Sequence, residues 1–106
     1  MLFRSHRWWT RNDSQLTFSF NESRKYAIKL DVHGHRDWRV PTKGELNVLF
    51  NNRAAIGGFD ESGSVEGGWY WSSTEYDYYV AWGQRFSDGY QGWSSKSNAS
   101  SLRCVR

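Results

Sequence analysis

The stretch WYWSSTEYDYYVAWGQRFSDGYQGW, residues 69–93, holds the strongest fold signal in the chain. Its aromatic and β-branched residues come in short runs separated by Ser, Asp and Gly, a pattern typical of strands and turns. Asp88 and Gly89 form a strong signal for a tight hairpin turn. Together with the end of the chain, this part predicts the short strands of a small antiparallel sheet, at residues 69–71, 81–86, 90–93 and 102–106.

Two helices are expected before these strands. Asn21 is the predicted N-cap of the first helix, which would run to about Leu30. The helical period would then turn Tyr26, Ala27 and Leu30 inward. Gly34 lies just past the end, where a glycine commonly stops a helix.

The second helix has a clearer start. Thr42 follows Pro41 and precedes Glu45 by three residues, the spacing of a capping box. Apolar residues on one face follow, at Leu46, Leu49 and Phe50. The helix should end near residues 51–53, ahead of a loop-like stretch that reaches residue 68. Because helices precede strands, the sequence predicts an α+β fold, with two helices beside a small antiparallel sheet and with long loops.

Composition bounds the possible classes of protein. A chain of 106 residues is long enough for one compact domain, and 18% aromatic residues with a single Pro argue against disorder. No apolar run approaches a membrane span, and residues 1–10 lack the apolar stretch of a signal peptide. The net charge is +3, but the basic residues of the first half are interspersed with acids. That dispersion favours a solvated face over a nucleic-acid site.

The two ends of the chain carry weaker signals. Cys104 is the only cysteine, so it can form neither a disulfide within the chain nor a zinc site with a second cysteine. It is expected to be a small buried hydrophobe. Near the start, residues 3–9 or 16–20 could each supply one more strand, although neither has a clean pattern.

Four motifs occur in order, which are DWRVPTKGEL at residues 37–46, WYWSST at 69–74, AWGQRFSDG at 81–89 and LRCVR at 102–106. Together they resemble the DUF1566 or Lcl C-terminal-like domains, a bacterial family with a C-type lectin fold. That family is related to the variable proteins of diversity-generating retroelements. The resemblance covers residues 16–106, expected to be a ligand-binding domain, and leaves residues 1–15 as an unmatched N-terminal segment.

The resemblance implies scaffold roles for several residues. Trp38 and Trp71 would be core aromatics, while Arg103, Cys104 and Val105 would lie in a closing strand. It also implies display on a cell surface or a phage particle. The oligomeric state stays open.

Residues 76–101 are rich in Tyr, Trp, Ser, Gly, Asn and Asp, a mixture that antibody paratopes also favour. Tyr and Trp give large contact areas, and Ser, Gly and Asn adapt their hydrogen bonds to a ligand. A loop-rich β domain could need the same residues for its turns and strands alone. The candidate ligand-binding residues are Tyr76, Asp77, Tyr78, Tyr79, Gly83, Ser87, Asp88, Tyr90, Gly92, Trp93, Ser94, Ser95, Ser97, Asn98 and Ser100.

Retroelement variable proteins randomise Asn codons at adenines. All the candidate residues except Trp93 can be encoded by such codons, whereas Gln84, Gln91 and Lys96 cannot. These four positions would therefore be constant between variable ones. The resemblance thus implies a surface that is diversified between relatives.

Catalysis and cofactors are not expected. The formylglycine-generating enzymes share the fold that the resemblance implies, but they depend on cysteine chemistry, and Cys104 falls in the expected final strand. His6, His33 and His35 lack an accompanying nucleophile or carboxylate motif. A further alternative is that the chain has a fold like that of the formylglycine-generating enzymes but lacks their catalytic activity.

Calcium is not expected to bind a sugar in this chain. The chain lacks the EPN, QPD and WND motifs of calcium-dependent lectins. A structural Ca²⁺ could be held by loop acids, but solvated acids are the favoured interpretation. The acids concerned are Glu61, Glu66, Glu75 and Asp77.

The sequence therefore predicts a non-catalytic domain that binds a protein or a glycan. Tyr76, Tyr78, Tyr79, Tyr90 and Trp93 would be the anchors of that contact. The alternative is a structural or assembly module of a surface or phage-tail protein, in which the same aromatics pack against a neighbouring chain.

Overall fold

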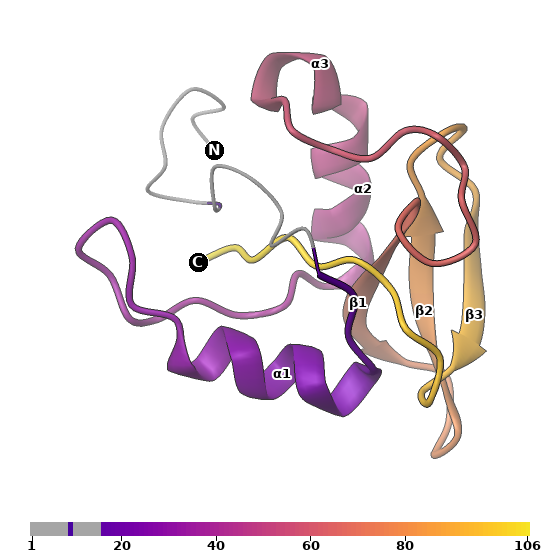
Figure 1. Cartoon of the computed structure of the whole chain (residues 1–106), viewed down its shortest axis with the longest axis horizontal. Helices are drawn as coiled ribbons and strands as arrows, with labels where there is room; N and C mark the ends of the chain where they lie inside the picture. Colours follow the sequence, from indigo (N-terminus) through magenta and orange to yellow (C-terminus); the bar gives the residue numbers. More distant parts are fainter. Residues whose placement is uncertain (1–8, 10–15) are drawn as a thin grey trace.

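The computed structural model describes residue 9 and residues 16–106, so most of the strand considered at residues 3–9 lies outside the described part (Figure 1). Within these described residues, three helices precede three strands, which confirms the predicted α+β class. The helices and strands are α1 (Phe20–Lys29), α2 (Lys43–Asn51), α3 (Arg53–Ile56), β1 (Trp69–Glu75), β2 (Val80–Arg85) and β3 (Gln91–Ser95). Within the described residues, no helix is long and apolar enough to cross a membrane.

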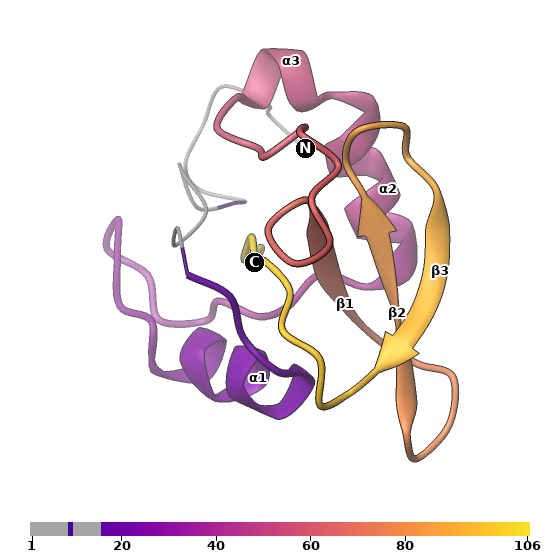
Figure 2. The same cartoon turned by 45° about the vertical axis from the view of Figure 1, so that its right-hand side comes forward.

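The strands form one antiparallel sheet in the order β1-β2-β3 (Figure 2). Trp71 lies opposite Gly83, and Gly83 lies opposite Gly92, so these three residues share one face of the sheet. The predicted turn at Asp88 and Gly89 joins β2 to β3. Gly89 has a φ of +83°, which favours glycine, and an added β-carbon there would collide with the Phe50 ring.

The predicted strand at residues 102–106 is wrong. Val105 forms isolated bridges with Trp9 and with Arg39, but its neighbours form no ladder. In the part of the chain that the structure describes, neighbouring segments pair with residues 102–106 only at single residues, so they form no ladder with this end. The side chains of Leu102, Cys104 and Val105 are nevertheless buried, and this burial explains their strand-like pattern.

Helix α1 begins two residues earlier than predicted. Its N-cap is Ser19, whose side chain accepts a hydrogen bond from the Glu22 amide, while the Glu22 carboxylate accepts one from the Ser19 amide at 2.9 Å. Asn21 therefore lies inside the helix. Phe20 occupies the first helical position and is 1% exposed, so the helix must start early enough to bury it.

This difference predicts unequal effects for two neighbouring substitutions. Ser19→Ala removes the N-cap and is expected to lower the free energy of unfolding by about 1 kcal/mol. Asn21→Ala, the matched control, should change it by much less, because Asn21 is exposed and caps nothing. Urea denaturation followed by circular dichroism compares the two variants. Equal losses would show that the Ser19 cap is not formed in solution.

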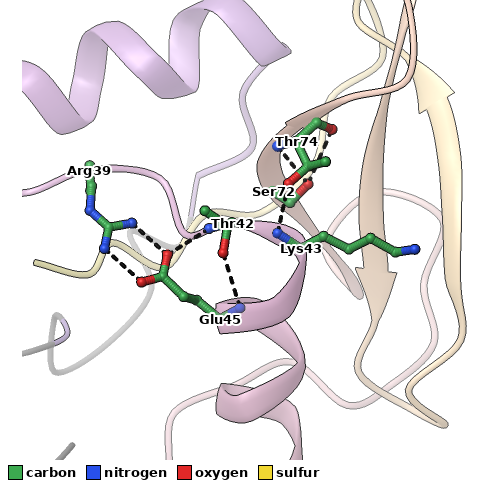
Figure 3. Close-up of polar contacts among 6 residues, drawn as sticks. All are labelled: Arg39, Thr42, Lys43, Glu45, Ser72 and Thr74. Carbon is green, nitrogen blue, oxygen red and sulfur yellow. Dashed lines mark hydrogen bonds and ion pairs between the residues drawn. The ribbon is translucent and has the colours of Figure 1, made fainter.

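Helix α2 starts as predicted. Thr42 and Glu45 form a complete capping box, and the Glu45 carboxylate also accepts two hydrogen bonds from the Arg39 guanidinium (Figure 3). The Lys43 amide donates to Thr74 Oγ1 at 2.9 Å, which ties the start of α2 to β1. The helix ends at Asn51, but the short helix α3 before Gly57 was not predicted.

The pH dependence of stability should report on this network. The hydrogen bonds from Arg39, followed by those from Thr42, lower the pKa of Glu45 from 4.5 to about 2. Because the folded-state pKa is lowered, the stabilisation is present above about pH 4.5 and is lost as the pH falls toward about 2. Glu45→Gln should therefore destabilise the protein near neutral pH and less so at the acidic end. A difference that did not change with pH would contradict this role for the ionised carboxylate.

The core lies on both faces of the sheet. Tyr70 and Phe86 pack with Leu46 and Leu49 of α2. Trp71 points to the opposite face, because successive strand residues alternate. There the second core cluster gathers around Trp71, with residues of α1, of the segment before α2, of β2 and of the chain end, namely Phe20, Ala27, Trp38, Val40, Ala81, Leu102 and Cys104. The predicted core roles of Trp38, Trp71 and Cys104 are confirmed, and burial raises the pKa of the Cys104 thiol to about 12.

Candidate ligand-binding surface

Three aromatic side chains form what we call the aromatic platform, Tyr76, Trp82 and Trp93. Trp82 and Trp93 lie opposite each other in β2 and β3, and their rings meet edge to face with centroids 5.4 Å apart. The Tyr76 ring stacks on Trp93 at 4.4 Å with an interplanar angle of 25°. Tyr76 is 54% exposed and Trp93 is 55% exposed, so a large apolar area faces solvent.

Lys43 borders the aromatic platform. Its ammonium nitrogen lies 3.7 Å from the Trp82 ring centroid, and Figure 3 shows the side chain reaching from the start of α2 toward the sheet. Its backbone is held on both sides, because Gln91 Nε2 donates to the Lys43 carbonyl at 3.0 Å while the Lys43 amide donates to Thr74. The platform therefore combines aromatic faces with a fixed cation.

A second group, which we call the tyrosine hollow, consists of Tyr78, Tyr79, Ser95 and Ser97. Tyr78 is 82% exposed and Tyr79 is 73% exposed, and both project from the turn between β1 and β2. Asp77 shapes this turn, since its Oδ1 accepts hydrogen bonds from the Tyr79 amide at 2.7 Å and the Val80 amide at 2.9 Å. All four residues of this group line one broad, shallow depression.

The turn between β2 and β3 carries Ser87, Asp88 and Tyr90. Asp88 accepts two hydrogen bonds from Arg85, at 3.0 and 2.6 Å, and a third from the Tyr90 amide. These hydrogen bonds, those from Arg85 first, lower the pKa of Asp88 to about 2. The Arg85 guanidinium lies 5.5 Å from the centroid of the Tyr90 ring. Ser87 is exposed. Asp88 therefore orders the turn that presents Tyr90, which is 59% exposed.

All the remaining candidates except Gly92 meet at a pocket of about 280 Å³ on the face of the sheet opposite α2. We call it the Trp69 pocket. Its lining residues are Val65, Glu66, Trp69, Trp71, Gly83, Trp93, Ser94, Asn98, Ala99 and Ser100. Gly83 and Ser100 are buried, so they shape this hollow rather than the exposed surface. Gly92 faces Gly83 across the strand pair.

The predicted residues therefore fall into several neighbouring groups rather than one continuous patch. Sequence reasoning missed Trp69, Trp82, Lys43 and Glu66, which complete these groups. A signal was present for Trp82, because residues that lie opposite each other in paired strands share a face, and Trp82 lies opposite Trp93. No local pattern relates Lys43 to β2, since their contact depends on how α2 packs.

The structure shows ordinary structural contacts for most of the side chains considered for metal or acid–base chemistry. The rings of His33 and His35 meet the edge of Trp38, and His6 lies outside the described residues. Glu61 pairs with Arg53 at 2.9 Å. Among residue 9 and residues 16–106, no three His, Cys, Asp or Glu side chains group closely enough to hold a metal ion.

The chain matches the model of a known protein family. Residues 4–106 match the model of the Lcl C-terminal domain. The match takes in most of residues 1–15, where the motifs gave no resemblance. No curated protein matches the chain.

Proposed function

The chain belongs to the Lcl C-terminal domain family, and from this premise we propose that it is a non-catalytic module that binds a protein or glycan ligand. The observation that carries the proposal is the stacked pair of Tyr76 and Trp93, which leaves more than half of each residue exposed. Burial of exposed aromatic area against a partner lowers the free energy, and contiguous exposed apolar patches are typical of interaction sites. Large aromatic groups supply most of the binding energy in protein interfaces.

The scaffold under these aromatics supports the proposal. Trp82 and Trp93 stand on paired strands, and the turn that carries Tyr79 is closed by Asp77. Side chains held on rigid elements lose little conformational entropy on binding. The anchors would be Tyr76, Tyr78, Tyr79, Tyr90 and Trp93, with Ser and Gly positions between them providing shape.

A screen on arrays of glycans and of surface proteins tests this function. The wild-type domain and Trp93→Ala are screened in parallel, with Ile28→Ala as the control because Ile28 is also exposed but lies on α1. We expect at least one ligand that the wild type and the control bind and Trp93→Ala does not. Ligands that all three bind equally would contradict the proposal.

The assembly alternative uses the same aromatics to contact a second copy or a neighbouring chain. Analytical ultracentrifugation of the wild type and of Trp93→Ala over a range of concentrations distinguishes assembly from ligand binding. We expect the two proteins to sediment alike. A concentration-dependent oligomer that Trp93→Ala dissolves would favour assembly over ligand binding.

The finer family relation belongs to the same proposal. We propose that the chain adopts a C-type lectin-like fold, as the family resemblance implies. We also propose that its surface is diversified, because most candidate residues can arise from randomised Asn codons. Sequencing the locus from many isolates tests the second point. Variation concentrated at adenine-derived positions of residues 76–101 is expected, with Trp93 and Gln91 constant. Variation spread evenly over residues 37–46 and 76–101 would contradict diversification.

A further inference from the structure

The indole of Trp69 lines the Trp69 pocket and lies beside two glycines. An added β-carbon on Gly83 would lie 3.6 Å from Trp69 Cε3, and one on Gly92 would lie 3.7 Å from Trp69 Cη2. Gly83 and Gly92 are directly opposite each other in β2 and β3. The six-membered ring of the indole therefore lies close to both strands, where neither glycine has a side chain.

The rim of the pocket carries both hydrogen-bond donors and acceptors. Asn98 Nδ2 donates to Ser94 Oγ at 2.9 Å, which fixes both side chains side by side. Glu66 adds a carboxylate. Within the described part of the chain, no Lys, Arg or His nitrogen forms an ion pair with Glu66. Among residue 9 and residues 16–106, none of the side chains that line the pocket is cationic.

We propose that the Trp69 pocket binds one neutral pyranose ring of a glycan. The C–H face of such a ring would stack on the indole, and its hydroxyl groups would meet the amide, hydroxyl and carboxylate of the rim. Hydroxyl groups both donate and accept, so they match a rim of mixed polarity. The pocket, at about 280 Å³, lies just below the usual range for drug-sized ligands, so it suits a single ring.

Charge selects among the possible ligands. An anionic sugar would bring its carboxylate or sulfate next to Glu66, and like charges repel. A cationic ligand needs acceptors only, and it would leave the donor groups of the rim, such as Asn98 Nδ2, without a partner on the ligand. A neutral ring avoids the repulsion and uses both the donors and the acceptors. This inference rests on the proposed function, because it names the glycan class for one part of the binding surface.

Nuclear magnetic resonance titration of the ¹⁵N-labelled domain tests the pocket directly. The neutral probes are methyl β-D-glucopyranoside, methyl β-D-galactopyranoside and methyl α-D-mannopyranoside. The charged probes are methyl β-D-glucuronide and choline. We expect at least one neutral pyranoside to shift the Trp69 indole N–H and the Asn98 side-chain amide in a saturable manner. The glucuronide and choline should leave both signals in place.

Two variants sharpen the test. Asn98→Ala removes one hydrogen-bonding group and should weaken the binding of the neutral probe by about tenfold. Glu66→Gln removes the negative charge, so it should admit the glucuronide that the wild type rejects. Ile28→Ala is the control, because Ile28 lies on α1 and does not line this pocket, so the sugar affinity should be unchanged.

Failure has distinct signatures. If no neutral pyranoside shifts these signals, or if choline or the glucuronide shifts them as strongly, the inference about the pocket is overturned. Binding of an array-selected ligand that depends on Trp93 would still support the proposed function in that case. Conversely, the pocket could bind a pyranoside while no array ligand depends on Trp93, and then only the role of the aromatic platform would fall.

Discussion

Replacing Trp93 with alanine is expected to abolish ligand binding and to leave the thermal midpoint of unfolding nearly unchanged. Trp93 is 55% exposed, and its ring contacts are with Tyr76 and Trp82 of the same exposed platform. Truncation of an aromatic anchor at the centre of an interface typically costs about 2 kcal/mol or more, roughly a thirtyfold loss of affinity. Tyr79→Ala should behave in the same way, because Tyr79 is 73% exposed.

Calorimetry of both binding and unfolding measures the two effects on the same samples. Ile28→Ala controls for the loss of exposed apolar area, since Ile28 is 73% exposed. A large fall in the thermal midpoint for Trp93→Ala would mean that Trp93 is part of the core. Unchanged affinity would remove Trp93 from the binding surface.

Replacing Trp71 with alanine should have the opposite outcome, with a loss of about 3–5 kcal/mol in the free energy of unfolding. Trp71 is 1% exposed, and its indole meets the Phe20 ring edge to face at 5.7 Å. Its Nε1 donates to the Phe18 carbonyl at 2.7 Å, so the variant also leaves that acceptor without this donor. Urea denaturation gives the free energy of unfolding.

Trp71→Phe is a useful companion variant. It keeps an aromatic ring and loses the indole N–H, so it should be less destabilising than Trp71→Ala. If Trp71→Ala were as stable as the wild type, the assignment of Trp71 to the core around α1 would be wrong.

Trp71 and Trp93 illustrate how much of the fold could be predicted from sequence. The strand positions of both follow from aromatic runs and the turn at Asp88, and the helix start at Thr42 follows from its capping box. These signals are local, because each depends on residues within a few positions of one another. Which of the two tryptophans is buried depends on where α1 packs, and no local pattern encodes that.

The errors have different origins. The sequence SFNE contains a capping box at Ser19, which is a local signal that the prediction of an N-cap at Asn21 overlooks, and the burial of Phe20 against Trp71 agrees with the earlier start. The residues at the chain end look like a strand since their side chains are buried, yet Val105 finds only single-residue partners. Burial and strand pairing produce similar sequence patterns.

The candidate site was predictable in composition and not in arrangement. The exposed tyrosines at Tyr78 and Tyr79 follow from a turn rich in Asp and Tyr. The Trp69 pocket does not, because its lining joins Trp69 and Trp71 of β1, Gly83 of β2 and Ser94 of β3, which the pairing of the strands brings together. Only the register of the sheet reveals that juxtaposition.

The most direct test of the aromatic surface is chemical-shift mapping of an array-selected ligand on the ¹⁵N-labelled domain at fixed protein concentration. We expect the largest changes at the indole N–H groups of Trp82 and Trp93 and at the amides of Tyr76 and Tyr79. Changes confined to α1 and to residues 31–36, with these signals unmoved, would contradict a ligand-binding role for the aromatic platform.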